Sequence, residues 1–211
     1  MQRADASELL EDPSLPEEVV AEAYRDLHRT QRFLGNTRAI FRHLRKSRQP
    51  IKRVLDIGCG QGALLEQIRK KLGVDVIGFD LRPAPGAPIL IVTGNAAVDP
   101  LPSADVAITV CLVHHLTEAD AISMIRNVSK SCRRLILLDL VRHWIPLTLF
   151  RVFMAPFLHP INASDGLTSV KRAYTPGELR KIVDEGTQGT NARIVHTVAP
   201  FYIRQIIDVE F

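Results

Sequence analysis

The sequence has few cysteines and no long apolar run, and both absences exclude classes of protein. Its three cysteines, Cys59, Cys111 and Cys132, are widely spaced and form no Cys-x-x-Cys pair. We therefore expect no structural disulfide and no zinc site, and the cytoplasm is the expected compartment. No signal peptide is expected, because residues 1–5 are polar. No transmembrane segment is expected either, because the most apolar stretch, residues 144–158, is short and interrupted by prolines and an arginine.

The excess of positive charge is small. Lysine and arginine number 27 against 23 aspartates and glutamates, a formal net charge of +4. This is weak support for nucleic-acid binding. A basic cluster within residues 42–53 is interpreted as a solvated helix face and linker in preference to an RNA-binding patch. Nucleic acid is therefore not an expected partner, and neither is a metal ion, because no cluster of carboxylates suited to a divalent metal is evident.

The central part of the chain alternates apolar runs with amphipathic stretches. Strands are predicted over 54–57, 75–79, 88–92, 105–110 and 135–138, with helices over 63–72 and 118–131 between them. Continuous apolar strands separated by helices predict an α/β fold with a mostly parallel sheet and helices on both faces. In such a sheet, ligands bind beyond the carboxyl ends of the strands.

The flanking regions have other patterns. Residues 6–47 are predicted to form an N-terminal helical cap, with one helix beginning at Pro16 and a second, capped by Asn36 or Thr37, running through Leu44. A capping box is predicted at Thr175 and Glu178, and two closing strands are predicted over 192–198 and 201–207. A chain of 211 residues with this composition predicts a single domain, 1–211.

The most informative stretch is Val-Leu-Asp-Ile-Gly-Cys-Gly-Gln-Gly at residues 54–62. Three alternate glycines follow a buried strand and precede a helix, so a ligand can approach the backbone closely. The turn also satisfies the dinucleotide pattern G-x-G-x-x-G/A, which is a weak signal alone. Asp56 argues against a nicotinamide enzyme, because this acid would repel a pyrophosphate. It could instead accept hydrogen bonds from a cationic ligand. Asp80, about 20 residues on, suits a carboxylate that binds two ribose hydroxyls.

These residues resemble the first motif of class I S-adenosylmethionine-dependent methyltransferases. Asp80 falls where those enzymes hold the ribose, and Gly94-Asn95-Ala96 resembles their adenine-side segment, with Asn95 in place of the usual acid. Residues 112–116, Leu-Val-His-His-Leu, resemble the segment after the fourth strand in the branch that includes ubiquinone and menaquinone methyltransferases. The resemblance covers about residues 50–140. It implies a Rossmann-like, seven-stranded sheet whose last strand is antiparallel, a cap over 1–50, and a lid or substrate-side insertion over 141–190.

The resemblance also implies a set of contacts. The cofactor would be S-adenosylmethionine, with S-adenosylhomocysteine as product. Its expected contacts are Asp56, Gly58, Cys59, Gly60, Gly62, Asp80, Leu81, Asn95, Ala96, Cys111 and Leu112. Cys111 is interpreted as a wall residue, because no activating partner is evident nearby.

His114 and His115 are the candidates for acid–base catalysis, since an imidazole titrates near neutral pH. The alternative is that one packs against the sheet and the other shapes the pocket. Candidate contacts to the acceptor are Asp139, Arg142, His143 and Tyr174. For the first three, a helix-capping role is an open alternative.

The sequence therefore predicts transfer of a methyl group to a small-molecule acceptor. The apolar stretch 144–158 favours an apolar or aromatic acceptor, although it could simply pack on the sheet. O-methylation is favoured over C- or N-methylation. The alternative hypothesis is a non-catalytic module that binds S-adenosylmethionine or associates with RNA.

Overall fold

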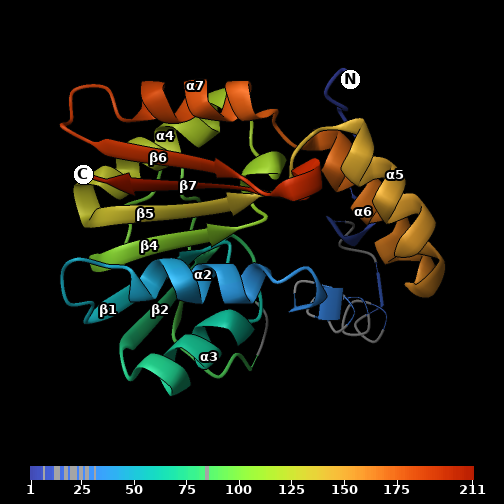
Figure 1. Ribbon diagram of the computed structural model, residues 1–211. Coiled ribbons are helices and arrows are strands. Elements are labelled where there is room, and N and C mark those ends of the chain that lie inside the picture. The colour runs from blue at the N-terminus through green and yellow to red at the C-terminus, as the bar shows by residue number, and fades with distance from the viewer. Residues whose placement is uncertain are drawn as a thin grey trace.

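The computed structural model describes residues 1–6, 8–11, 15–16, 19, 23, 26, 29–30, 32–83 and 86–211. These residues form a seven-stranded sheet in the order β3-β2-β1-β4-β5-β7-β6 (Figure 1). The strands are β1 (Arg53–Ile57), β2 (Asp75–Asp80), β3 (Ile91–Thr93), β4 (Ala104–Val110), β5 (Cys132–Asp139), β6 (Arg193–Val198) and β7 (Gln205–Glu210). The first five are parallel to one another, and β7 is antiparallel to both β5 and β6. The predicted mostly parallel sheet with an antiparallel last strand is confirmed.

Helices cover both faces of the sheet and its carboxyl edge. On one face lie α2 (Asn36–Arg45) and α3 (Ala63–Leu72), and on the other lie α4 (Glu118–Ser131) and α7 (Pro176–Gly186) (Figure 1). Beyond the carboxyl ends of the parallel strands lie α5 (Trp144–Phe153), η3 (Ala155–Phe157) and α6 (Pro160–Arg172). The described residues also form the short helices η1 (Leu9–Glu11), η2 (Val113–His115) and η4 (Pro200–Tyr202).

The pleat of the strands divides the interior into two apolar cores. On β5, Leu135 and Leu137 pack with α4 and α7, whereas Ile136 and Leu138 pack with α2 and α3. All four side chains are fully buried. Because successive side chains of a strand point to opposite faces, a run of apolar residues fills both cores at once.

Several predicted boundaries need correction. The helix α2 begins at Asn36 itself, and the N-cap is Gly35 in the left-handed region, with no side-chain cap from Asn36 or Thr37. The third strand is only Ile91–Thr93, shorter than the predicted 88–92. The last strand begins at Gln205, because residues 200–202 form the short helix η4, in which Phe201 has a φ of 59°.

The predicted helix from Pro16 falls largely outside the described residues. Val20 and Leu27 of its expected apolar stripe lie outside them, whereas Val19 and Ala23 are helical and Ala23 is fully buried.

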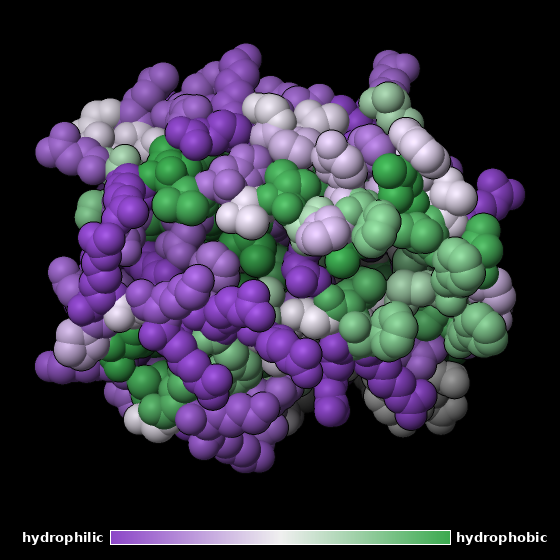
Figure 2. All heavy atoms as spheres, viewed as in Figure 1, coloured by the Kyte–Doolittle hydropathy of each residue, from purple (hydrophilic) through white to green (hydrophobic). Residues whose placement is uncertain are grey.

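The helices of the region predicted as a lid, residues 141–190, lie in two different places in the structure. Its last helix, α7, packs on α4 against the sheet, so of this region α5, η3 and α6 lie beyond the carboxyl edge. Gly166 of α6 lets the ring of Phe150 pack against its backbone, since a Cβ there would lie 2.1 Å from Phe150 Cζ. The outer surface of this region is apolar (Figure 2), with Trp144, Phe153 and Phe157 all more than half exposed. Within the described ranges, every helix falls short of the length and apolarity that a bilayer span requires.

The capping box predicted at the start of α7 is present. Thr175 Oγ1 accepts from the backbone N–H of Glu178, and Glu178 Oε2 accepts from the N–H of Thr175. We expect Thr175→Ala to lower the free energy of unfolding by about 1 kcal/mol, because one N–H of the first turn loses its acceptor. Urea denaturation measures this difference. The matched control is Thr148→Ala on the exposed side of α5, where alanine's better helix propensity predicts no loss. Equal stability of Thr175→Ala and the wild type would contradict the assigned cap.

Candidate functional site

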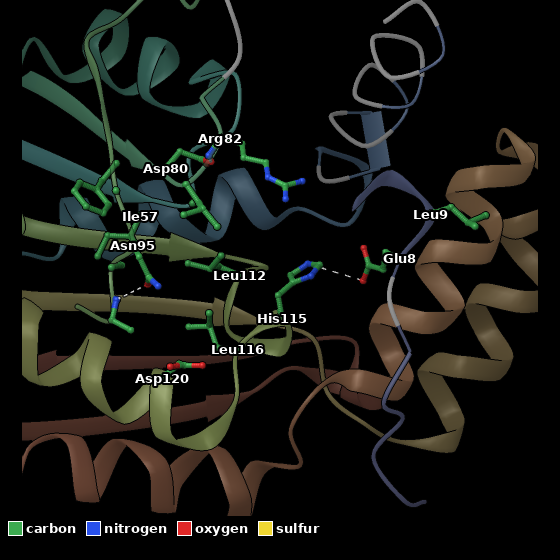
Figure 3. Close-up of a pocket in the computed structure, with 16 residues that line it drawn as sticks. Glu8, Leu9, Ile57, Asp80, Arg82, Asn95, Leu112, His115, Leu116 and Asp120 are labelled. Atoms are coloured by element: carbon green, nitrogen blue, oxygen red, sulfur yellow. Dashed lines mark hydrogen bonds and ion pairs between the residues drawn. The ribbon is translucent and has the colours of Figure 1, made fainter. Parts of the chain in front are cut away.

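Two adjoining cavities lie at the carboxyl edge of the sheet, with volumes of about 820 Å³ and 580 Å³. They share five lining residues, Glu8, Gly58, Asp80, Leu112 and His115. Figure 3 shows the first cavity, with strand ends on one side and the N-terminal segment and α6 on the other. The two cavities therefore form one crevice at the position where parallel α/β sheets bind ligands.

The glycine turn after β1 needs backbone conformations that favour glycine. Gly58, Gly60 and Gly62 have φ values of 75°, 54° and 72°. A Cβ on Gly58 would lie 2.9 Å from Leu112 Cδ1, so a side chain at this position would also crowd the crevice. The turn leads directly into α3, whose N-cap is Gly62. Of the three glycines, Gly58 lines both cavities and Gly60 lines the second, so backbone without side chains faces the crevice there.

Asp80 joins this turn to the neighbouring strand. At the end of β2, its Oδ2 accepts from the N–H of Gly60 at 2.8 Å, and its Oδ1 accepts from the N–H of Arg82 at 2.8 Å. Each carboxylate oxygen can accept further hydrogen bonds. Because Asp80 lines both cavities, its carboxylate lies where one ligand extending through both would pass.

Asp56 is a buried acid that lacks a complete set of partners. It is 3% exposed and lines the second cavity, and its Oδ1 has no hydrogen-bond partner among the described residues. Burial, and then the nearby charge of Asp80, raise the pKa of Asp56 well above its ordinary value. A cationic ligand beside it would relieve both effects, since an opposite charge favours the ionised form.

Except for Gly62, which lines neither cavity, the other predicted cofactor residues also line the crevice. Leu81, Asn95 and Ala96 line the first cavity, Cys59 and Cys111 line the second, and Leu112 lines both. Asn95 Oδ1 accepts from the N–H of Ala97, and Asn95 N–H donates to Asp99. Burial raises the pKa of Cys59 to about 12, so this residue is present as the neutral thiol. Cys111 has a φ of 55°, unusual for a residue with a side chain.

The two histidines follow β4 in the short helix η2 and differ in burial. His114 is 2% exposed, and its Nδ1 lies 2.6 Å from Asp139 Oδ1, whereas His115 lines both cavities. Burial alone would lower the pKa of His114, but the charge and hydrogen bond of Asp139 outweigh it and raise that pKa. Burial alone would raise the pKa of Asp139, and His114 instead brings it below its ordinary value. Their geometry and charge therefore describe a buried His114–Asp139 ion pair beneath a more accessible His115.

The four residues predicted to contact the acceptor lie behind the crevice. Among the described residues that line the two cavities, none of the four is present. Asp139 accepts from His114 and Leu140, and buried Arg142 binds Glu178 and the carbonyl of Ala173. His143 caps α5 by accepting from the N–H of Ile145, and Tyr174 donates to the carbonyl of Leu116. These contacts fit the capping and packing alternatives, and direct contact with an acceptor stays a prediction without support from this geometry.

Sequence patterns do not reveal the residues that close the crevice from the opposite side. Glu8 lines both cavities, and Asn162, Asp165 and Ser169 of α6 line the second. The Asp165 carboxylate accepts from the N–H groups of Leu9 and Leu10, which ties the N-terminal segment to α6. None of these residues belongs to a motif, so only the tertiary structure reveals them.

The comparisons with known proteins agree with this fold and site. A search of curated protein sequences finds no match. The structure resembles the plantazolicin methyltransferase BpumL in complex with SAH, with a TM-score of 0.70 at 14% identity, covering 93% of this chain and 91% of that one. It also resembles human N-acetylserotonin methyltransferase in complex with SAM, with a TM-score of 0.53 at 15% identity, covering 76% and 47% of the two chains.

A seven-stranded sheet with this strand order and a glycine turn after β1 defines the class I methyltransferase fold. Residues 25–146, more than half of the chain, match the profile of a methyltransferase domain family. The chain belongs to this methyltransferase domain family. The predicted fold class and family are confirmed.

Proposed function

We propose that this methyltransferase transfers the methyl group of S-adenosylmethionine to the hydroxyl group of a small apolar or aromatic acceptor. The observation that carries the proposal is Asp56, a buried acid that lines the second cavity next to the glycine turn and whose Oδ1 has no partner among the described residues. An unpartnered buried carboxylate is costly unless a ligand completes its hydrogen bonds. The ammonium group of S-adenosylmethionine is such a ligand.

The two cavities suit the two halves of this cofactor. We assign the adenosine to the first cavity, with Asn95 and Ala96 at the adenine, and the methionine part to the second, beside Cys59 and Gly60. Asp80 lines both and would bind the ribose hydroxyls at their junction. Cys111 and Leu112 would then flank the sulfur. The neighbours BpumL and human N-acetylserotonin methyltransferase contain SAH and SAM respectively.

The part of the second cavity beyond the sulfur supports an apolar acceptor. It is lined by Leu140 and by Phe150, Leu158 and Val170 from the helices beyond the sheet edge. Apolar walls with a few polar groups are typical of small-molecule sites. The sulfonium methyl is already activated, so the main task of the protein is to align the acceptor, the methyl group and the sulfur. His115, which lines both cavities, is placed to receive the proton of a hydroxyl acceptor.

Calorimetric titration with S-adenosylhomocysteine tests the proposal through the Asp56→Asn variant. We expect the variant to bind about tenfold more weakly, because an amide replaces the charge that pairs with the ammonium group. The fold should be at least as stable as the wild type, because the substitution removes an isolated buried charge rather than a partner of one. Thermal melting checks this point, and Asp75→Asn, an exposed acid at the other end of the sheet, is the matched control.

Turnover is measured with labelled S-adenosylmethionine and two sets of acceptors. One set is phenols, and the other is amines of the same shape, which serve as the comparison. Labelled product from the phenols would support O-methylation, whereas product from the amines alone would contradict it. Unchanged affinity of Asp56→Asn would contradict the assigned cofactor site. Salt-sensitive RNA binding without turnover would favour the non-catalytic alternative.

A further inference from the structure

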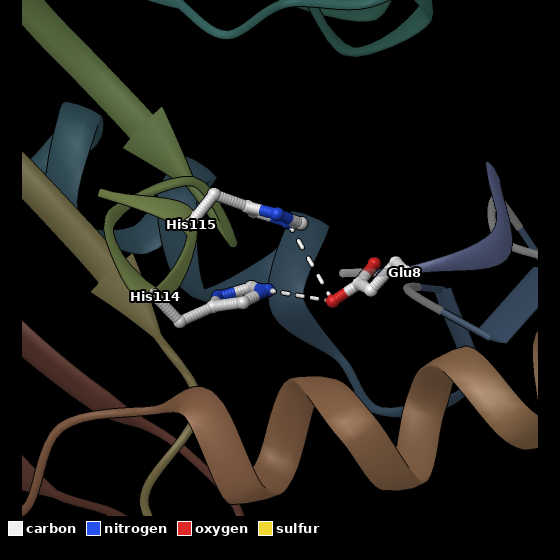
Figure 4. Close-up of side chains that lie close together, drawn as sticks. All are labelled: Glu8, His114 and His115. Atoms are coloured by element: carbon white, nitrogen blue, oxygen red, sulfur yellow. Dashed lines mark ion pairs between the residues drawn. The ribbon is translucent and has the colours of Figure 1, made fainter. Parts of the chain in front are cut away.

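Three potential metal ligands meet at the junction of the two cavities. Glu8 Oε1 lies 3.8 Å from His114 Nε2 and 3.9 Å from His115 Nε2, and the three ligand atoms all lie within 4.8 Å of one another. Figure 4 shows both imidazoles directed toward the same carboxylate oxygen. The two rings are close, with centroids 4.2 Å apart. Two nitrogen ligands and one oxygen ligand therefore converge on one point of the crevice.

The orientation of His114 leaves its Nε2, rather than its Nδ1, available to a metal ion. The Asp139 carboxylate accepts from His114 Nδ1 at 2.6 Å and from the backbone N–H of the same residue at 3.0 Å. Because an ionised carboxylate can only accept, Nδ1 carries a proton, so Nε2 is the nitrogen that, once deprotonated, would offer its lone pair toward Glu8. A metal-binding histidine commonly donates its other ring N–H to a carboxylate in this way, which fixes the orientation of the imidazole.

Glu8 is also held in position from behind. Its Oε1 lies 2.6 Å from Ser169 Oγ, and the next two residues, Leu9 and Leu10, donate their N–H groups to Asp165. The Glu8 side chain is 10% exposed. The carboxylate is thus fixed to α6 before any ligand enters.

The distances distinguish this cluster from ordinary hydrogen bonding. Separations of 3.8 Å and 3.9 Å exceed the usual limit of about 3.2 Å for a hydrogen bond. Ligands that share one zinc ion, each about 2.0–2.2 Å from it, lie roughly 3–4 Å apart. The gap between Glu8 and the two imidazoles therefore has the size that a small divalent cation needs.

We propose that Glu8, His114 and His115 bind one divalent first-row transition-metal ion, such as Zn²⁺ or Mn²⁺. Two histidines and one carboxylate form a ligand set typical of catalytic metal sites, which keep a further position open. Here the open position faces the crevice, because Glu8 and His115 line both cavities. No metal is expected from the sequence because it shows no cluster of carboxylates, and Glu8 is more than 100 positions from the histidines.

The role of the ion rests on the proposed function. At the open position it would bind the acceptor oxygen and lower the pKa of its hydroxyl, so that the proton passes to water. The resulting oxyanion would form the new C–O bond while the C–S bond of the sulfonium breaks. The imidazole of His115 would then act through the ion rather than as a free proton acceptor.

The test uses the full chain, treated with a chelator and dialysed, without cofactor or acceptor. We expect calorimetric titration with Zn²⁺ and with Mn²⁺ to show one site per chain, and Zn²⁺ to raise the melting temperature. Glu8→Gln and His115→Ala should each weaken binding by about tenfold or more. His196→Ala, on β6 and paired with Gln205, is the matched control and should bind like the wild type. Mg²⁺ should bind more weakly, because it prefers oxygen ligands.

Two results would overturn the proposal. One is the absence of a stoichiometric site for either ion in the wild type. The other is an adventitious ion only, in which Glu8→Gln and His115→Ala bind Zn²⁺ and Mn²⁺ as tightly as the wild type does. Because this test contains no cofactor, its failure leaves the proposed methyl transfer standing, and failure of S-adenosylhomocysteine binding leaves the metal site standing.

Discussion

Replacement of Asp80 by alanine is expected to weaken the binding of S-adenosylhomocysteine about 100-fold, or about 2.7 kcal/mol. The variant loses the carboxylate assigned to the two ribose hydroxyls, and hydrogen bonds to charged groups are worth about 1.5–3 kcal/mol each. It also removes the acceptor of the Gly60 N–H, so the glycine turn loses one of its hydrogen bonds to β2 and keeps that from the Gly58 N–H to the Phe79 carbonyl. Calorimetric titration measures the affinity.

The control for this prediction is Asp75→Ala, which removes an acid from the opposite end of the same strand. The ion pair of Asp75 with Arg53 is exposed, so cofactor binding and stability should change little. Circular dichroism and thermal melting show whether Asp80→Ala keeps its fold. An Asp80→Ala protein that folds and binds within twofold of the wild type would contradict the assigned ribose contact.

The second large effect concerns stability rather than binding. Asp208 on β7 accepts from Arg134 Nε at 2.7 Å and from Arg134 Nη2 at 2.6 Å, and its Oδ2 lies 2.8 Å from His43 Nδ1. These contacts tie α2 to β5 and β7. We expect Asp208→Ala to lower the free energy of unfolding by about 3 kcal/mol, because it leaves the buried Arg134 without its counter-charge. Urea denaturation at neutral pH measures the loss.

The control for Asp208→Ala is a substitution of Asp184, whose ion pair with Arg180 on α7 is exposed. Asp184→Ala should change stability by no more than about 0.5 kcal/mol. A loss for Asp208→Ala as small as that for Asp184→Ala would contradict the assigned role of the buried pair.

The same interaction predicts a dependence of stability on pH. Burial alone would raise the pKa of Asp208, but the hydrogen bonds from Arg134 and His43 outweigh it and hold that pKa below its ordinary value of 3.8. A lowered folded-state pKa contributes stability above the ordinary value, and this is lost as the pH falls through 3.8 toward the folded pKa. The wild type should therefore lose stability in this acidic range more steeply than Asp208→Ala. If the stability of both proteins fell equally steeply with pH in this range, the assigned linkage would be contradicted.

The cofactor side of the crevice could be predicted from the sequence because its parts are local. A buried strand, alternate glycines and a helix over 54–72 specify a strand–turn–helix unit with free backbone groups at one end. Acids that follow strands, such as Asp80, then gather at the carboxyl edge of any parallel sheet. The positions of Asn95, Cys111 and Leu112 in the crevice follow from the same rule.

The acceptor side could not be predicted in this way, because it is assembled from distant segments. Asp139 and Arg142 follow a strand as expected, yet their charges are used within the fold, by His114 and by Glu178. Position at a strand end places a residue near the crevice, but only packing decides whether its side chain faces the ligand or a neighbour. The shortened third strand and the later start of β7 have a similar origin, since pairing with neighbours sets their limits.

The sequence by itself determined the parallel sheet and the glycine turn with its two acids, because each follows from local periodicity and the order of elements along the chain. The antiparallel last strand was implied by the resemblance to class I methyltransferases. Only the tertiary structure brought Glu8 to His114 and His115 and turned Arg142 and Tyr174 away from the crevice. The physical reason is that a contact between distant segments depends on how helices such as α6 pack across the sheet edge, which no short stretch of residues specifies.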